Sequence, residues 1–579
     1  MDLSGKQNKA ALASLLVLAI YFAFSSYSGL NAFFTGDDGG NLLNMHKYWQ
    51  HSLGSVVGSA LRVVTGAYRP LGGIFYFALY RLAGFNPLPF RVVCLSLMLA
   101  NLLFAFTLLR RLSGSLEAAF IGAVLIANHP AMLELLYSSG TIYEILCFLF
   151  YFLTVSCYLV WREARELAGF STLSWRQLAA VLILTGCALD SKEMAMTLPA
   201  ALLLVELVYY PPGSWFGREA LRSALRLGRV ALAAAALVVP TIAVKVLTHN
   251  PLSEDARYGP LTLRGLLRGM RAYQSFLLYR GLSPGGITTL QWLALWTAML
   301  VLAVALRSRA MKFGLGFLIV SLVPIALINV RNGYMVYIPL MGWALYAGSL
   351  FEWICGIAFR WRPPRVQLAL KFGALLAAAM LIAHTHTTEL AKNRTYFEQY
   401  HRDNRRIVER LSEQHPHLPR GASLLLVDDP LPPGFELLFL ERLAHADPAL
   451  ELDRLKMLRE PPSGAELTRY EFVIAGGWQL HDVRGISDPR PPVEVRFSPR
   501  KVRPREDCTI EIPEFAGQTV DLIVRTGVTE ILQRCTLDSS GRAAWAATPE
   551  SAPATMAIRW LRTGDGDWES AAGTLEIRR

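Results

Sequence analysis

Long apolar segments constrain the fold of this chain more than any other feature. A bilayer core is about 30 Å thick and a helix rises 1.5 Å per residue, so roughly 20 apolar residues span it. Uncharged or nearly uncharged stretches of about that length occur at 11–30, 92–109, 116–128, 141–161, 177–189, 195–210, 230–246, 290–306, 313–328, 334–359 and 367–385. The sequence therefore predicts a polytopic α-helical membrane protein with about eleven transmembrane helices.

Basic residues fall in every second connection between these stretches. Residues 1–386 hold 31 Lys+Arg against 15 Asp+Glu, and short cytoplasmic loops are the ones that carry excess Lys and Arg. The basic connections contain Lys6, Lys9, Arg110, Arg111, Arg162, Arg165, Arg176, Arg218, Arg222, Arg226, Arg229, Arg307, Arg309, Lys312, Arg360, Arg362, Arg365 and Lys371. The pattern predicts a multi-pass protein of a bacterial inner membrane, with a cytoplasmic N-terminus and a periplasmic C-terminal tail.

The tail differs from the rest in composition and pattern. Residues 387–579 hold 26 Lys+Arg and 30 Asp+Glu, which gives no support to a nucleic-acid partner. Buried-strand patterns at 423–427 and 470–475, with a helical pattern at 434–446, predict a small α/β domain. Alternating runs from residue 491 onward are typical of an immunoglobulin-like β-sandwich. Cys508 and Cys535 lie in this region, and the sequence does not decide whether they form a disulfide. We expect three domains: transmembrane at 1–390, helix plus α/β at 391–485, and sandwich at 486–579.

Ionisable and aromatic residues collect in the connections predicted to face outward. Asp37 and Asp38 follow the first stretch directly. Ionisable groups at the edge of a bilayer are energetically unfavourable, so they are functional candidates by default. Any one of them could instead be a turn, a helix cap or a snorkelling side chain. The other members of the set are Arg69, His129, Glu134, Lys192, Glu193, Arg331, Tyr334 and Tyr337.

Carboxylates mixed with fixed cations suit transfer from a phosphorylated donor. Asp37 or Asp38 can accept a proton from an attacking hydroxyl. Arg69, Lys192 and Arg331 can stabilise the departing phosphate. The remaining members would support the site, with Glu134 and Glu193 orienting the cations or holding a divalent metal, which the sequence does not require.

These motifs resemble the GT-C superfamily of polytopic glycosyltransferases, which use polyprenyl-phosphate-linked sugars on the extracytoplasmic side. The resemblance covers about residues 10–400 and is strongest to the protein O-mannosyltransferase-related group. The motifs similar to that group are Asp37-Asp38, Tyr68-Arg69-Pro70-Leu71, His129-Pro130 with Glu134, Lys192-Glu193, and Arg331 with Tyr334, Tyr337 and Pro339. The tail departs from its members with tetratricopeptide repeats, because no 34-residue helical period is visible.

By that resemblance, the chain is a hexosyl- or mannosyltransferase-like enzyme. One aspartate of the first-loop pair acts as the base, and the product is an inverted glycoside. The motif does not fix which aspartate it is, and we favour Asp37. The acceptor would be a protein, glycan or lipid hydroxyl, and metal use varies within the superfamily.

Rival functions make different demands on the same residues. A transporter or flippase of lipid-linked sugars would place ionisable groups near the midplane and show repeated halves. An O-antigen ligase or polymerase would share the donor but not the acidic pair of the first loop. A surface adhesion module would need far fewer than eleven membrane helices.

Overall fold

The computed structural model of the 579-residue chain divides into two compact units. One comprises Met1–Phe33 with Asn44–Glu398, and the other Phe34–Leu43 with Gln399–Arg579. The predicted domain boundaries near residues 390 and 485 stay predictions. The structure describes residues 3–49, 69–170, 172–211, 228–247, 262–280, 286–327, 330, 332–414, 418–426, 442, 444–445, 447, 449–454, 472–475, 479–482, 493–503, 506–526, 529–546, 554–562 and 568–577.

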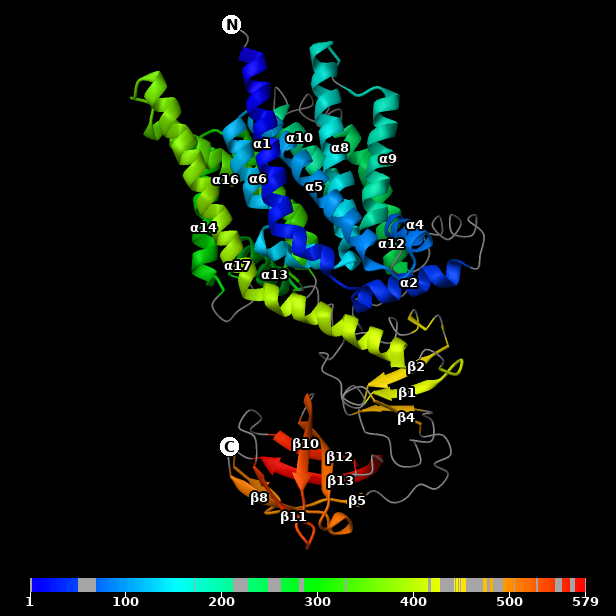
Figure 1. The fold of residues 1–579 in the computed structure, drawn as a ribbon. Helices are drawn as coiled ribbons and strands as arrows, with labels where there is room; N and C mark the ends of the chain where they lie inside the picture. The colour runs from blue at the N-terminus through cyan, green and yellow to red at the C-terminus, as the bar shows by residue number, and fades with distance from the viewer. Residues whose placement is uncertain are drawn as a thin grey trace. The chain divides into compact units, whose positions relative to one another are not determined.

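The first unit is a helical bundle in which every predicted apolar stretch lies on a helix. Figure 1 shows these helices running side by side. They are α1 Leu3–Ser26, α5 Pro87–Ser113, α6 Leu116–Ile126, α8 Ile142–Leu167, α9 Trp175–Ser191, α10 Leu198–Tyr209, α12 Arg229–Leu247, α14 Thr289–Ala305, α15 Arg309–Ala326, α16 Tyr337–Ala358 and α17 Pro364–Gln414. The polytopic helical fold is thus confirmed.

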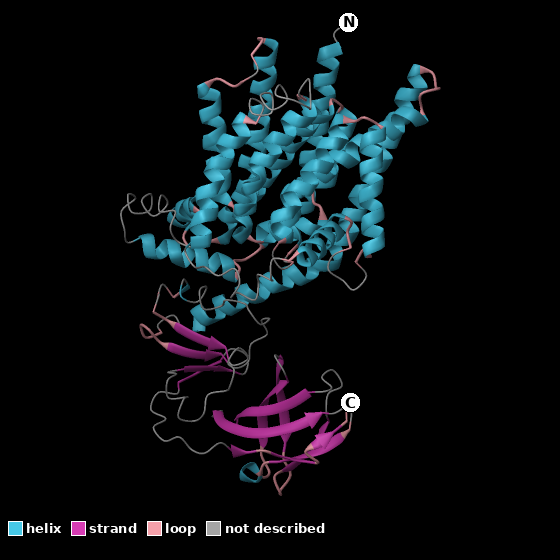
Figure 2. Ribbon diagram, turned by 180° about the vertical axis from the view of Figure 1, so that it is seen from behind, coloured by secondary structure: helices cyan, strands magenta, loops and turns pink. Residues whose placement is uncertain are grey.

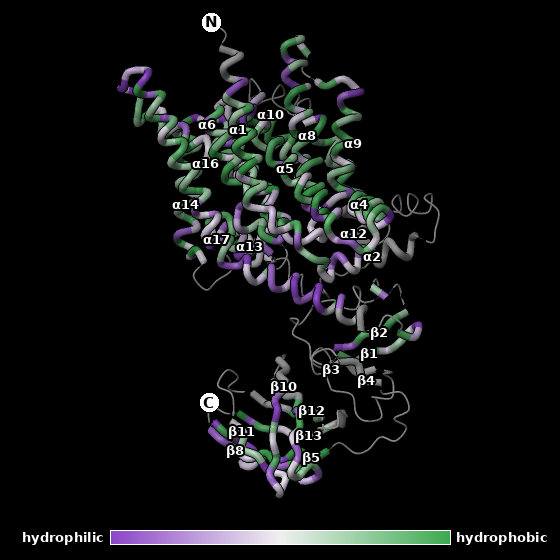
Figure 3. Tube along the Cα trace, viewed as in Figure 1, coloured by the Kyte–Doolittle hydropathy of each residue, from purple (hydrophilic) through white to green (hydrophobic). Residues whose placement is uncertain are grey.

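Not every one of these helices is long enough to cross a bilayer. Within the described ranges, six are long and apolar enough. A seventh is formed if α6 and the segment Pro130–Tyr137, bent by 47°, count as one span. The chain is therefore an integral membrane protein, and the number of eleven spans stays a prediction. Figure 3 shows the apolar residues along the bundle helices.

The two ends of the bundle are built differently. Two connections at one end lead into helices that serine residues cap: Ser115 caps α6 after a left-handed Gly114, and Ser174 starts α9 with a capping box. The other end holds α4 Pro70–Ala83, α13 Leu263–Leu277 and the short α7 Leu133–Tyr137. It also holds the 3-10 helices η1 Tyr27–Asn31, η2 Pro130–Met132, η3 Ser139–Thr141, η4 Glu193–Thr197 and η5 Gly333–Val336. We call the end with the Ser115 and Ser174 connections the basic end, and the end with α4, α7, α13 and these 3-10 helices the polar end.

Glycines allow three helices of the bundle to pack backbone against backbone. A Cβ atom added at Gly348 of α16 would collide with the Ala118 carbonyl oxygen of α6. Gly342 of α16 and Gly314 of α15 face each other, and a Cβ on either would lie 2.8 Å from the carbonyl oxygen of the other. Small residues permit such close approach of membrane helices. The helices α6, α15 and α16 thus form a tightly packed core.

The second unit contains the predicted small sheet. Its strands are ordered β2 Glu451–Arg454, β1 Ser423–Leu426, β3 Phe472–Ala475 and β4 Gln479–Asp482. Strand β1 is parallel to both β2 and β3, while β4 is antiparallel to β3. The predicted strands at 423–427 and 470–475 are therefore confirmed. The predicted helix at 434–446 lies largely outside the described residues.

The remainder of this unit is a pair of β-sheets with one core (Figure 2). One sheet has the order β10 Thr529–Thr536, β9 Thr519–Thr526, β12 Ala554–Arg562, β13 Trp568–Ile577 and β5 Val493–Glu494, with β7 Lys501–Val502 also paired to β13. The other has the order β11 Arg542–Ala546, β8 Asp507–Glu511 and β6 Arg496–Ser498. Trp545 and Ile510 from the second sheet share a buried core with Leu522 and Leu575 from the first.

The paired sheets match the predicted strands, and their immunoglobulin-like character stays a prediction. Cys508 and Cys535 are buried and have free thiols.

Candidate functional site

The two adjacent aspartates lie in the first turn of α2, Gly36–Trp49, and have different surroundings. The Asp38 carboxylate accepts hydrogen bonds from the backbone N–H and the hydroxyl of Thr35, both at 2.9 Å. In return, the Asp38 backbone N–H donates to Thr35 Oγ1 at 3.4 Å. This reciprocal pair is a capping box, which starts a helix and satisfies two of its free N–H groups. Asp38 is fully buried, and its carboxylate is engaged in this capping box.

Asp37 is exposed, in contrast to its neighbour. Its backbone carbonyl accepts a hydrogen bond from the Asn41 side chain at 2.8 Å. The N-terminal turn of a helix favours a negative charge, and the Asp37 side chain lies in that turn and faces solvent. Of the two aspartates, Asp37 is the one whose carboxylate is accessible to a substrate.

An ion pair joins Arg69, directly before α4, to Glu193, the first residue of η4. Nη2 of Arg69 lies 2.9 Å from Oε2 of Glu193, and the side chains are 28% and 24% exposed. The guanidinium carbon also lies 5.2 Å from the centre of the Tyr143 ring. Burial by itself lowers the pKa of Arg69, but attraction to Glu193 outweighs it and the pKa is raised. The Nε of Arg69 is buried and has no hydrogen-bond acceptor among the described residues.

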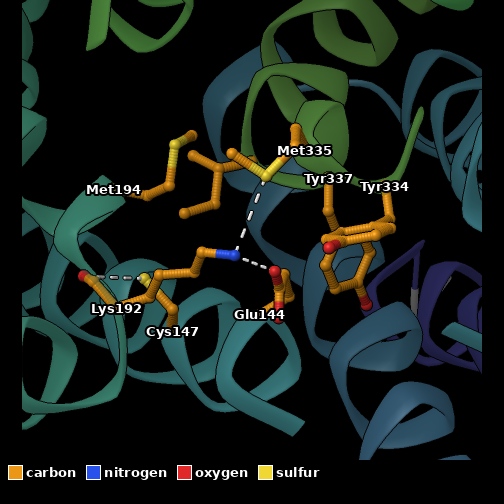
Figure 4. Close-up of a pocket in the computed structure, with 8 residues that line it drawn as sticks. Glu144, Cys147, Lys192, Met194, Tyr334, Met335 and Tyr337 are labelled. Atoms are coloured by element: carbon orange, nitrogen blue, oxygen red, sulfur yellow. Dashed lines mark hydrogen bonds and ion pairs between the residues drawn. The ribbon is translucent and has the colours of Figure 1, made fainter. Parts of the chain in front are cut away.

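A second, more buried ion pair links Lys192 to Glu144 in the first turn of α8 (Figure 4). Both side chains are less than a tenth exposed. The Lys192 ammonium also lies 3.7 Å from Met335 Sδ and 5.5 Å from the centre of the Tyr334 ring. The surrounding cavity measures only about 10 Å³, room for one water at most. In this conformation Lys192 faces a carboxylate rather than an open substrate pocket.

Two further predicted site residues support the segment around η5. Glu134 accepts a hydrogen bond from the Asn332 side chain at 2.7 Å. Tyr337 is buried and stacks on Phe148, with ring centres 4.2 Å apart. They hold the segment that carries Tyr334 and Met335. Arg331, predicted to bind phosphate, lies outside the described residues.

His129 has a different set of neighbours. It is fully buried, stacks on Tyr279 at 4.8 Å and lies edge-to-face with His386 at 5.6 Å. His386 in turn lies within hydrogen-bond distance of the hydroxyls of Tyr21 and Tyr279, at 3.2 and 3.0 Å. His129 therefore belongs to a cluster that joins α6 to α1, α13 and α17.

Sequence reasoning assigned no role to Glu144, Tyr143, Met335 or Asn332. Glu144 carried a signal that could have identified it, because a carboxylate in the first turn of a membrane helix needs a partner. Across the part of the chain that the structure describes, no group of three or more His, Cys, Asp or Glu side chains could hold a metal ion.

Comparison with known proteins adds three structures. No family model and no curated protein matches the sequence. ArnT from Cupriavidus metallidurans bound to undecaprenyl phosphate is 14% identical with a TM-score of 0.44, over 78% of this chain and 86% of ArnT. The Archaeoglobus fulgidus oligosaccharyltransferase in its apo form is 13% identical with a TM-score of 0.42, over 76% of this chain and 64% of its own.

The third structure is the archaeal oligosaccharyltransferase AglB from A. fulgidus in complex with an inhibitory peptide and a dolichol-phosphate. It is 13% identical with a TM-score of 0.41, over 76% of this chain and 64% of its own. Nothing in these three structures singles out the O-mannosyltransferase-related group. Their TM-scores are below 0.5, so no step of the proposal below depends on them.

Proposed function

We propose that the chain is a membrane glycosyltransferase that moves a sugar from a polyprenyl-phosphate-linked donor to an acceptor hydroxyl on the extracytoplasmic face. The observation that carries this proposal is the gathering of two cation–carboxylate pairs at the polar end. Arg69 with Glu193, and Lys192 with Glu144, come from segments far apart in sequence. The motif resemblance adds the donor class.

Arg69 is the principal group proposed to bind the donor phosphate. Its side chain is 28% exposed, Glu193 pairs with one edge of the guanidinium, and its buried Nε has no acceptor among the described residues. Charge-assisted hydrogen bonds from arginine suit a phosphate geometrically. Lys192 and Arg331 are the other two cations proposed for phosphate, and Glu144 fixes the position of Lys192.

Asp37 is the proposed general base, since its carboxylate is exposed whereas that of Asp38 serves the capping box. In the reaction, the Asp37 carboxylate takes the proton of the acceptor hydroxyl as the oxygen attacks the anomeric carbon. The bond from that carbon to the phosphate oxygen breaks, and the lipid phosphate leaves with the electron pair. Attack opposite the leaving group inverts the anomeric centre.

The test compares Asp37→Asn with Asp38→Asn in purified membranes supplied with a labelled polyprenyl-phosphate hexose. Loss of a general base lowers the rate by about 10²–10⁴-fold, so Asp37→Asn should abolish transfer at unchanged expression. Asp38→Asn should lower thermal stability and keep most of the rate per folded molecule. Full transfer by Asp37→Asn would exclude it as the base.

The flippase reading makes a different prediction. A flippase would move labelled lipid-linked sugar across a liposome membrane without any acceptor, and we expect no such movement. Orientation is tested separately, because protease should reach the tail only from the extracytoplasmic side.

A further inference from the structure

We propose that a groove between α1 and α5, at the basic end, binds an anionic phospholipid. The groove has a volume of about 320 Å³, within the 300–1,000 Å³ range of ligand pockets. It is lined by Ala11, Leu15, Phe106, Thr107, Arg110 and Arg111. The two helices lie beside each other in Figure 1. The proposal is independent of the glycosyltransferase function.

The lining changes from apolar to cationic along one face of α5. Phe106 and Thr107 lie one turn before Arg110 and Arg111, which form the last turn of that helix. Residues three and four apart share a helix face, so the groove is apolar on its bundle side and positive at its mouth. An amphiphile with a negative headgroup matches this order, whereas a soluble anion would leave the apolar part unused.

The positive charge at the mouth is only partly neutralised. Arg111 is paired with Glu163, and their side chains are 39% and 55% exposed. For Arg110, the described residues contain no ion-pair partner. A basic pocket between membrane helices on the cytoplasmic side favours anionic headgroups.

The surface of α1 next to the groove is apolar and exposed. Leu12 and Leu16, neighbours of the two α1 lining residues, are 68% and 61% exposed. A phospholipid of the adjacent leaflet can therefore enter without leaving the bilayer. The proposed polyprenyl-phosphate donor, in contrast, is assigned to the polar end.

Native mass spectrometry of the detergent-purified full chain tests the proposal. We expect retention of added phosphatidylglycerol and little of phosphatidylcholine. A lysine or arginine near a membrane surface contributes enough attraction to change affinity about five-fold, so Arg110→Gln should weaken phosphatidylglycerol binding by about that factor. Arg176→Gln, the matched control, removes the same charge from an exposed arginine at the start of α9 and should change nothing.

Two further variants should change phosphatidylglycerol binding in opposite directions. Glu163→Gln releases Arg111 from its partner and should strengthen phosphatidylglycerol binding. Thr107→Trp should weaken it by filling the groove, while Ile183→Trp on the exposed face of α9 should not. Equal retention of both lipids, equal effects of Arg110→Gln and Arg176→Gln, or displacement of phosphatidylglycerol by equimolar polyprenyl phosphate would each overturn the proposal.

Discussion

The bundle has a buried ion cluster at each end, and the two are made from the same kinds of side chain. At the basic end, Glu206 of α10 accepts from the Tyr158 hydroxyl and lies 3.1 Å from Nε of Arg162 on α8. The Arg162 guanidinium also packs on the Tyr210 ring at 4.4 Å. At the polar end, Lys192 with Glu144 is as deeply buried.

The difference lies in the backbone that carries them. Arg162 and Glu206 join two regular helices, α8 and α10. Lys192 and Glu193 lie where α9 ends and the 3-10 helix η4 begins, and Arg69 lies at the start of α4. Irregular backbone within a membrane protein is tolerated where protein or a cavity satisfies it. A buried ion pair is therefore not by itself a sign of function, and we propose a functional role only for the ion pairs that lie at helix ends.

The largest effect is expected when one partner of a buried ion pair is removed: stability should fall at both ends, and activity only at the polar end. Removing one partner of a buried pair leaves an uncompensated charge and destabilises by about 3–5 kcal/mol. We expect that loss for both Glu206→Ala and Glu144→Ala in thermal unfolding. Transfer per folded molecule should fall only for Glu144→Ala. An equal fall in both variants would erase the distinction between the ends.

Arg69→Ala is expected to lower transfer by about 10²–10³-fold, the loss seen when one donor to developing charge is removed. Arg69→Lys keeps the charge but not the fork of N–H groups, so it should recover only part of the rate. The measurement is initial rate against donor concentration. A wild-type rate in Arg69→Ala would argue that the pair with Glu193 is structural, like that of Arg162.

The capping box of α2 predicts a smaller change. Thr35→Val removes the hydroxyl that accepts from Asp38 N–H, and loss of such a cap costs about 0.5–2 kcal/mol. Thermal unfolding should shift while the Asp37-dependent rate of folded protein stays within a few-fold. Thr35→Ser keeps the hydroxyl and is the matched control.

The smallest effect is expected for an exposed pair at the basic end. Arg111→Gln removes the partner of Glu163, and exposed ion pairs contribute about 0–1 kcal/mol. Neither unfolding temperature nor transfer should change measurably. A large loss of transfer would contradict our expectation that only the polar end takes part in catalysis.

Hydropathy predicts the helices well because each apolar stretch must satisfy its backbone hydrogen bonds within itself. Pairing is harder, since Arg69 meets Glu193 and Lys192 meets Glu144 only through the packing of distant helices. The neighbours of His129 could not be predicted for the same reason, because Tyr279 and His386 come from elements far along the chain. The Thr35–Asp38 capping box, in contrast, is a local pattern that the sequence itself contains.

The glycine contacts among α6, α15 and α16 determine which parts of the helical unit can move. Backbones already in contact leave no room to slide, so these helices should behave as one rigid block. Tyr334 and Met335 sit in η5, directly before α16, and are therefore fixed to that block. The cavity beside Lys192 is too small for a sugar, so binding of the proposed donor there would require displacement of segments outside the block, such as α4 with Arg69 at its start. We expect hydrogen exchange to be slowest in the block and faster in α4.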